Sequence, residues 1–535
     1  MKAFAPIAAL TLFASPALAQ QAPPPQLVVA ISVDQFAADV LARYRGDFSA
    51  GFVRLLGGAN FDGYQGHANT ETCPGHSTIL TGIRPARTGI VANDWYAATS
   101  PRPDKRVYCV EDETIPGSTY QDYKVSLKHL RVPTLGDRMK AANPASRVVS
   151  VAGKDRAAVL LGGKSADQTW WWWVPTSRFA SYDGRPLPAT LVRANAAIQA
   201  QLAKPQPPLE EPPLCAGMDR AVPVGSTTVG TFHFGRAIGD AKAFKISDEL
   251  DGATLAIAAG LVQEMKLGRG PAPDLLAVGL SANDYIGHAY GNGGPEMCLH
   301  LLALDRSLGD FFAFLDQTGV DYEVMLTADH GSQDIPERGG PPPRERITSD
   351  VNSRKVGETV AAALGLPANP LHALDAYGDV WIDPSVTGAV RNEVIAATVA
   401  AYQALPQVAT VLTHAQLLAT PIPTSAPDKW TLAEKARASF DAERSGDLVV
   451  LLKQGVVPIA KPSETHVDAH GVPWDSDRRV PILFWRKGIA GFTDPRPVET
   501  VDIMPTLAAT LHLPLPVKDY DGKCLNLGPS TTCPR

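Results

Sequence analysis

Short apolar runs that are followed by polar residues recur along this chain and constrain its fold more than any other feature. The clearest of them cover residues 27–33, 148–151, 275–280, 324–328, 448–452 and 481–485. Continuous apolar runs of this length are typical of strands that are buried on both faces. Helical patterns lie between them, for example at residues 295–315 and 502–511. The chain is therefore predicted to be an α/β protein with a mostly parallel central sheet flanked by helices.

Two less regular segments interrupt this pattern. Residues 180–245 are rich in proline and polar residues, and residues 336–440 begin at a Gly-Gly-Pro-Pro-Pro breaker. Such composition indicates inserted or capping segments. A length of 535 residues suits one large domain that carries insertions. We expect residues 20–535 to form that domain.

The N-terminus has the pattern of a secretory signal. A basic Met1-Lys2 start precedes a short apolar stretch at residues 8–14, and Ala17-Leu18-Ala19 matches a cleavage site. The apolar stretch is too short to span a bilayer, and a polar, proline-rich segment follows it. Residues 1–19 are therefore predicted to be a signal peptide, which implies a periplasmic or secreted protein. No later segment predicts a membrane span.

Cysteines and charge add two further expectations. Export permits disulfides among the six cysteines; Cys524 with Cys533 is the favoured pair and Cys215 with Cys298 a weaker one, although connectivity does not follow from sequence. The formal net charge is −6 and no basic run is present, so we expect no nucleic acid partner. An anionic ligand would have to be attracted by a local site. No oligomeric state is predicted.

Acidic and imidazole side chains follow several of the predicted strands. In open α/β sheets, functional sites lie beyond the carboxyl ends of the strands, so these side chains are expected to share a site. Mixed nitrogen and oxygen ligands favour zinc over magnesium or calcium. Each motif alone is weak: an Asp and a His four residues apart are usually accidental, and Asp-His-Gly is often a turn. The joint placement supports a metal site with the ligands Asp34, Asp284, His288, Asp329, His330 and His470.

Thr72 is the candidate nucleophile. It precedes a predicted helix whose first turn contains Pro74. A helix N-terminus suits a phosphate, and a hydroxyl bound to zinc there could attack phosphorus. The alternative is that Thr72 is only a helix cap. Cys73 and Ser77 are rival nucleophiles, although Ser77 would lie inside the helix.

Residues 72–76, 80–82 and 89–93 together resemble the nucleophile region of the alkaline phosphatase superfamily. The chain is most similar to its threonine-nucleophile branch, which includes nucleotide pyrophosphatase/phosphodiesterases and phosphate-irrepressible bacterial alkaline phosphatases. The resemblance extends from Asp34 to about Leu511. It implies an alkaline-phosphatase-like fold and metal-dependent hydrolysis of phosphate monoesters through a phosphothreonine intermediate.

The same resemblance implies roles for single residues. One of two Zn²⁺ ions per chain would be held by Asp284, His288 and His470. The other would be surrounded by Asp34, Thr72, Asp329 and His330. Thr72 would be phosphorylated and then released by water, and Asn93 would donate its amide to a phosphoryl oxygen.

Lys154 and Arg156 narrow the expected substrate. A Lys-x-Arg at this place contacts the phosphate in monoesterase members of the superfamily. A monoester dianion carries more charge and more free oxygens than a diester, which suits the planar fork of Arg156 and the point charge of Lys154. An isolated pair of this kind would more often be a solvated strand end. The expected substrates are therefore small-molecule phosphate monoesters.

Other interpretations stay open. A phosphodiesterase or nucleotide pyrophosphatase, or a phosphonoacetate-type hydrolase, would use the same threonine and zinc ligands. A catalytically silent binding module would lack a ligand or the nucleophile, and none is missing. The chain departs from the family's sequence pattern at residues 477–481, which read Asp-Arg-Arg-Val-Pro; relatives often have a histidine before Val-Pro. For the four tryptophans at positions 170–173 we favour core packing over a wall for the leaving group.

Overall fold

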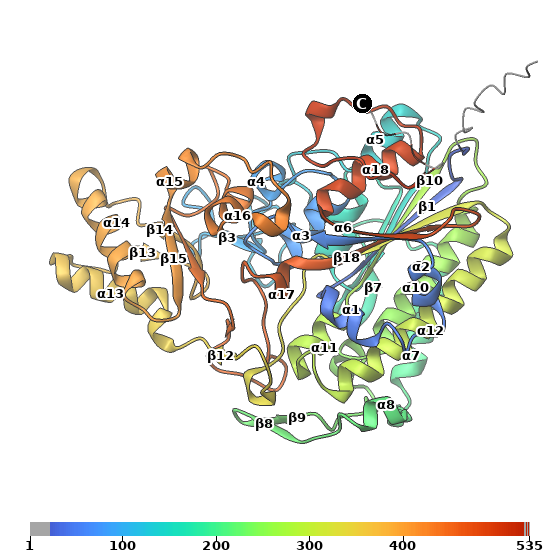
Figure 1. The fold of residues 1–535 in the computed structure, drawn as a ribbon, viewed down its shortest axis with the longest axis horizontal. Helices are drawn as coiled ribbons and strands as arrows, with labels where there is room; N and C mark the ends of the chain where they lie inside the picture. Colours follow the sequence, from blue (N-terminus) through green and yellow to red (C-terminus); the bar gives the residue numbers. More distant parts are fainter. Residues whose placement is uncertain (1–21, 529–530, 532, 534–535) are drawn as a thin grey trace, which may run out of the picture.

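The computed structural model describes residues 22–528, Thr531 and Cys533, so the predicted signal peptide lies outside the described residues. A nine-stranded sheet forms the centre of the molecule (Figure 1). In spatial order its strands are β19 (Phe492–Glu499), β2 (Ala59–Tyr64), β18 (Arg479–Arg486), β11 (Tyr322–Thr327), β1 (Leu27–Val33), β10 (Asp274–Leu280), β5 (Val148–Ala152), β6 (Gln168–Trp173) and β7 (Arg178–Ala180).

The middle of this sheet is parallel and its two sides are mixed. Strand β1 pairs in parallel with β10 and β11, and β5 pairs in parallel with β10 and β6. Strand β18, which contains the predicted strand at residues 481–485, runs antiparallel to both β11 and β2. The predicted fold class is confirmed, and the carboxyl ends of the parallel strands lie at one edge of the sheet.

Helices cover both faces of the sheet because its central strands are apolar on both sides. In β1, Leu27, Val29 and Ile31 pack in one core, whereas Val28 and Ala30 pack in the other. The first core contains α1 (Ala38–Tyr44), α2 (Gly51–Leu56), α7 (Ala189–Leu202), α10 (Asp248–Met265) and α12 (Pro295–Thr318). The second contains α3 (Thr72–Ile79), α5 (Leu135–Ala142) and α18 (Ile503–Thr510). The predicted helices at 295–315 and 502–511 are α12 and α18.

A second, smaller sheet lies to one side of the central sheet, drawn in orange in Figure 1. Its strand order is β13 (Leu371–His372), β14 (Gly378–Ile382), β16 (Leu448–Leu452) and β15 (Val408–Thr413). Helices α13 (Ser353–Leu364) and α14 (Gly388–Gln403) contribute to its separate apolar core. The apolar run at residues 448–452 was expected in the central sheet. It is instead an inner strand of this second sheet. An inner strand there is buried like a strand of the central sheet and therefore needs the same kind of apolar residues.

The segment at residues 180–245 contains α7, α8 (Pro213–Ala216), a hairpin of β8 (Val222–Val224) and β9 (Thr227–Val229), and α9 (Ala241–Lys245). Helix α7 packs in the core beside the central sheet. Trp170, Trp171 and Trp172 in β6 are buried and Trp173 is half-buried, so the core-packing interpretation is confirmed for the first three tryptophans of the run. Among the described residues, no helix combines the length and apolarity that crossing a bilayer requires.

Three disulfides are present in the structure. The two predicted pairs, Cys524–Cys533 and Cys215–Cys298, are confirmed. The third joins Cys73 in α3 to Cys109, directly after β4 (Arg106–Tyr108). Because its sulfur is bonded to Cys109, Cys73 is not available as the rival nucleophile.

Helix α3 lies against the end of β11 at a glycine. A Cβ atom at Gly75 would overlap the backbone carbonyl of Asp329. We expect Gly75→Ala to lower the free energy of unfolding by about 1–3 kcal/mol, because the helix or the strand end must move. The matched control is Gly252→Ala in α10, where an added Cβ meets no atom within 4 Å, and which should be neutral or stabilising by up to about 1 kcal/mol. Urea denaturation measures both. Equal stability of Gly75→Ala and the native chain would contradict the close approach.

Candidate active site

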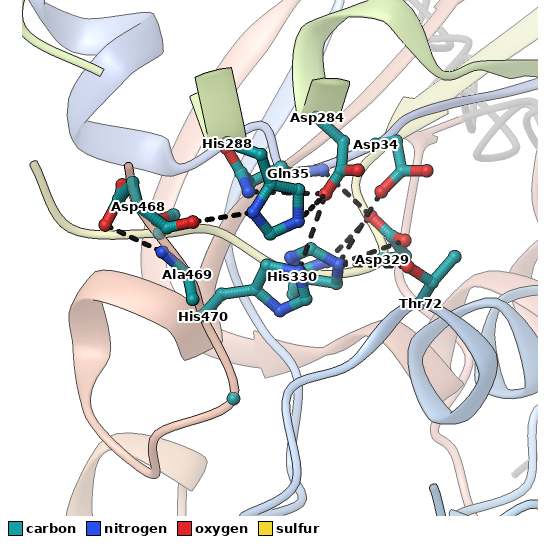
Figure 2. A network of polar contacts seen from close by, with 12 residues as sticks. Asp34, Gln35, Thr72, Asp284, His288, Asp329, His330, Asp468, Ala469 and His470 are labelled. Carbon is teal, nitrogen blue, oxygen red and sulfur yellow. Dashed lines mark hydrogen bonds and ion pairs between the residues drawn. The ribbon is translucent and has the colours of Figure 1, made fainter. Parts of the chain in front are cut away.

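The edge of the central sheet brings the predicted metal ligands together (Figure 2). Asp34 directly follows β1, and Asp329 and His330 follow β11. Asp284 and His288 lie one turn apart on α11 (Ala282–Tyr290), which begins just after β10. The sixth ligand, His470, lies in the loop between β17 (Val456–Val457) and α17 (Asp475–Arg478). The imidazole and carboxylate groups point toward one another.

Distances divide these donors into two overlapping groups. The Nε2 atoms of His288 and His470 lie 3.3 and 3.5 Å from Asp284 Oδ1. His330 Nε2 lies 3.5 Å from Asp34 Oδ1 and 3.4 Å from Asp329 Oδ2. Ligand atoms lie within 4.8 Å of one another in the groups Asp284/His330/His470 and Asp34/Asp329/His330. Since His330 belongs to both groups, the two groups adjoin one another.

The three imidazoles are oriented for metal binding. In each ring Nδ1 contacts a backbone carbonyl: that of Asp468 for His288 (2.8 Å), of Gly331 for His330 (3.0 Å) and of Thr70 for His470 (2.8 Å). A carbonyl only accepts, so Nδ1 carries the proton. The Nε2 lone pair is left facing the carboxylates, as in most metal-ligating histidines.

The carboxylates also fit a cation. Asp329 Oδ1 accepts hydrogen bonds from the backbone N–H groups of Gln35 and His330, both at 3.0 Å, which leaves Oδ2 to face the cluster. Asp34 is buried; its Oδ1 accepts no hydrogen bond from the described residues, and its Oδ2 is paired with Lys154 Nζ at 2.6 Å. Burial, and then the charge of Asp329, raise the pKa of Asp34. A bound divalent cation would compensate these buried oxygens, so the donor set fits a metal centre.

Lys154 and Arg156 enter the site from the start of α6 (Asp155–Gly162), directly after β5. Lys154 Nζ lies 2.5 Å from Asp284 Oδ2 and 2.6 Å from Asp34 Oδ2. Burial lowers the pKa of this lysine, but Asp284 and Asp34 more than compensate and raise it above its ordinary value. Arg156 Nη2 lies 3.4 Å from Thr72 Oγ1. Both cations therefore border the same space as the carboxylates and the threonine.

Thr72 is the first residue of α3, and Glu71, not Thr72, occupies the N-cap position. Its Oγ1 lies 3.5 Å from His330 Nε2. The hydroxyl therefore faces the metal ligands and Arg156, which differs from the predicted alternative of a simple cap. The rival Ser77 is buried within α3 and donates its hydroxyl to the carbonyl of Pro74.

Asn93 lies beside the start of α3. Its Oδ1 accepts the backbone N–H of Cys73 at 2.9 Å, and its own backbone N–H donates to Glu71 Oε2 at 2.6 Å. These two bonds hold the amide and leave the Nδ2 donor available to an oxygen of a ligand. This orientation agrees with the expected role of Asn93.

Several positioning residues were not predicted from sequence. Gln35, whose backbone has a φ of 62°, donates Nε2 to Asp284 Oδ1 at 3.2 Å. Asp477 accepts the backbone N–H groups of Gly471 and Val472 at 2.9 and 3.2 Å and so holds the loop of His470. Residues 477–481 stood out in the sequence only because a histidine was missing before Val-Pro, which did not indicate this role of Asp477. No local pattern indicated Gln35 beyond its place after Asp34.

Arg156 is held by a group of tyrosines that sequence reasoning also missed. Its Nη1 lies 3.4 Å from the hydroxyl of Tyr108. Tyr108 and Tyr123 donate to the two oxygens of Asp155 at 2.9 and 2.6 Å. The segment between α4 (Pro85–Thr88) and α5 thereby orients the guanidinium group toward Thr72.

Known proteins with similar sequences and structures agree with this geometry. Residues 28–473 match the family model "Type I phosphodiesterase / nucleotide pyrophosphatase". The chain is 49% identical to alkaline phosphatase PhoK of Sphingomonas sp over 513 residues, covering 95% of this chain and 92% of that one. Identity to alkaline phosphatase PhoD of Zymomonas mobilis is 45% over 518 residues, covering 95% and 89%.

A solved structure extends the likeness to the fold. The crystal structure of wild type alkaline phosphatase PafA matches with a TM-score of 0.81 at 26% identity, covering 95% of this chain and 99% of that one. The resemblance predicted from the nucleophile region is therefore confirmed. The chain belongs to the type I phosphodiesterase/nucleotide pyrophosphatase family of the alkaline phosphatase superfamily.

Proposed function

We propose that this chain is an alkaline phosphatase that hydrolyses phosphate monoesters through a phosphothreonine intermediate at Thr72. The observation that carries the proposal is the contact of Arg156 with Thr72 Oγ1, beside Lys154 and a cluster of metal ligands. The names of the relatives PhoK, PhoD and PafA support the same activity. The family is one of metal-dependent phosphoester hydrolases.

The proposed cofactors are two Zn²⁺ ions. One is assigned to Asp284, His288 and His470, and the other to Asp34, Thr72, Asp329 and His330. The mixture of imidazole nitrogens and carboxylate oxygens supports zinc rather than magnesium or calcium. When bound, the two ions supply Lewis-acid stabilisation of the phosphoryl oxygens and lower the pKa of coordinated hydroxyl groups.

The side chains then have separate tasks. Thr72 Oγ1 gives up its proton to solvent and attacks phosphorus, so that a P–O bond to the protein forms. The bond to the leaving oxygen breaks, and that oxygen takes a proton from water and departs as an alcohol. We assign Asn93 Nδ2 to bind a phosphoryl oxygen, since the Oδ1 and backbone N–H of Asn93 are already engaged with Cys73 and Glu71. A water then attacks phosphothreonine, releases inorganic phosphate and restores the hydroxyl of Thr72.

The preference for monoesters follows from charge. A transferred monoester group has three free oxygens, and Arg156 is suited to bind two of them through its planar fork while Lys154 adds a point charge. In a diester, one of these oxygens carries an organic substituent. The alternatives are a phosphodiesterase, which the substrate comparison below separates, and a phosphonoacetate-type hydrolase.

We also propose that the protein is exported, as the pattern of residues 1–19 predicts. The three disulfides support this location, since such bonds persist in oxidising compartments.

Replacing the nucleophile should remove activity. We expect Thr72→Ala to lower kcat on 4-nitrophenyl phosphate by at least about a thousandfold, because no other hydroxyl replaces it. The control is the double variant Cys73→Ser/Cys109→Ser, which removes the neighbouring disulfide and keeps Thr72. If the Cys variant lost activity while Thr72→Ala kept it, the assignment of Thr72 would be wrong.

Removing Arg156 should change the substrate preference. For Arg156→Ala we expect kcat/KM for 4-nitrophenyl phosphate to fall about a hundredfold, and that for bis-4-nitrophenyl phosphate to fall much less. Arg193→Ala, an exposed arginine of α7, is the control and should leave the ratio of the two substrates unchanged. A native enzyme that preferred the diester would contradict the monoesterase proposal.

Metal content tests the cofactor assignment. Chelation should lower activity more than about a hundredfold, and added Zn²⁺ should restore it. Mass spectrometry of the metals should find two zinc ions in the native chain and fewer in His288→Ala. Asp219 is exposed and belongs to a separate group with the half-buried Glu211 and His233, and Asp219→Ala should keep both ions. Full activity in metal-free protein would be inconsistent with this assignment.

A further inference from the structure

A third cation lies near the site and comes from the segment at residues 180–245. Lys245 is the last residue of α9, and its Nζ lies 4.4 Å from the ring centre of Tyr285. Lys154 Nζ lies 5.1 Å from the centre of the same ring. Tyr285 follows the metal ligand Asp284 on α11. Lys245 therefore extends the positive region of Lys154 and Arg156 along this tyrosine.

The ammonium group of Lys245 lacks an anionic partner. Within residues 22–528, no carboxylate lies at ion-pair distance from it, whereas Lys242 on the same helix lies 3.9 Å from Glu464. Burial lowers the pKa of Lys245, and the charge of Lys154 lowers it further. A partly buried, unpaired cation beside two other cations is unfavourable until an anion binds. This arrangement points to a ligand with negative charge near Lys245.

Lys245 lies beside the part of the site that holds Asp284 and His288. Thr72 lies next to the cluster formed by Asp34, Asp329 and His330 (Figure 2). Lys245 contacts Tyr285, which follows Asp284 on α11, and the ring centre of His466, which lies near enough to feel the charge of Lys245, is 5.2 Å from that of His288. In an in-line displacement, the entering and leaving oxygens lie on opposite sides of phosphorus. A group near Lys245 and His466 would therefore face the leaving group.

The described residues of a pocket between the central and the second sheet, also beside the site, offer no cation to an anionic leaving group. These lining residues include Glu71, Asp94, Asp375 and Asp379 but no lysine, arginine or histidine. Burial raises the pKa of Glu71 to about 8 and that of Asp379 to about 6, which weakens the negative charge there without supplying a positive one. Lys245, by contrast, offers a cation.

We propose that Lys245, with His466 beside it, binds a second anionic group on the leaving group of the substrate. The preferred substrates are then phosphate monoesters of hydroxy acids or of molecules that carry another phosphate. This inference rests on the proposed monoesterase activity and adds a specificity-determining residue to it.

Two substrates that differ in one group test the proposal. The leaving group of 3-phosphoglycerate has a carboxylate where that of glycerol 3-phosphate has a hydroxymethyl group. We expect Lys245→Met to lower the ratio of kcat/KM for 3-phosphoglycerate to kcat/KM for glycerol 3-phosphate by about tenfold. Lys245→Arg should retain most of the ratio. The matched control Lys242→Met, on the exposed side of the same helix, should leave it unchanged.

A binding measurement separates specificity from turnover. Calorimetry on the slowly reacting Thr72→Ala chain should show about tenfold weaker binding of 3-phosphoglycerate when Lys245→Met is added. The role of Lys245 would be overturned if Lys245→Met left the ratio of the two kcat/KM values unchanged and bound 3-phosphoglycerate as tightly as the chain with Lys245. An equal fall in kcat/KM for both substrates would overturn it as well. If the native protein hydrolysed neither substrate, the proposed function would fail, and the calorimetric comparison would still decide the role of Lys245.

Discussion

Mutual repulsion among buried carboxylates is the constraint on which the site depends. Asp34, Asp284 and Asp329 are all buried at one edge of the central sheet. Carboxylates held together away from water must be neutralised, either by protonation or by cations between them. Lys154 supplies one cation directly, and the Nε2 atoms of three histidines complete a donor set for metal ions. In the proposed reaction, the positive charge gathered there would also bind the phosphate dianion.

The scaffold makes this convergence possible by holding the ligands on rigid elements. Parallel pairing of β1 with β10 and β11 places the residues after each strand at the same edge. Backbone carbonyls orient the imidazoles, and backbone N–H groups orient Asp329. Helix α3 brings Thr72 to the same edge, with Gly75 packed closely against Asp329. Nucleophile and ligands are thus positioned by the packing of the same layers.

Much of this was predictable because local patterns carry it. Apolar runs ending in Asp or Asp-His located the strand ends, and the Thr72 region resembled a known family. Features that depend on distant contacts were not predictable. The apolar run at residues 448–452 has the same sequence pattern whichever sheet the strand joins. Neither the Cys73–Cys109 disulfide nor the contact between Tyr108 and Arg156 follows from the spacing of residues in the sequence. Lys245 reaches the site only through the packing of its segment on α11.

The central claim is that Thr72 becomes covalently phosphorylated during turnover. Zinc-loaded protein can be mixed with a phosphate monoester, quenched in acid, digested and analysed by mass spectrometry. The account predicts one added phosphoryl group on the peptide that contains Thr72, lost when Thr72→Ala is used. A phosphoryl group on another residue, or turnover with none trapped under conditions that preserve phosphothreonine, would contradict it.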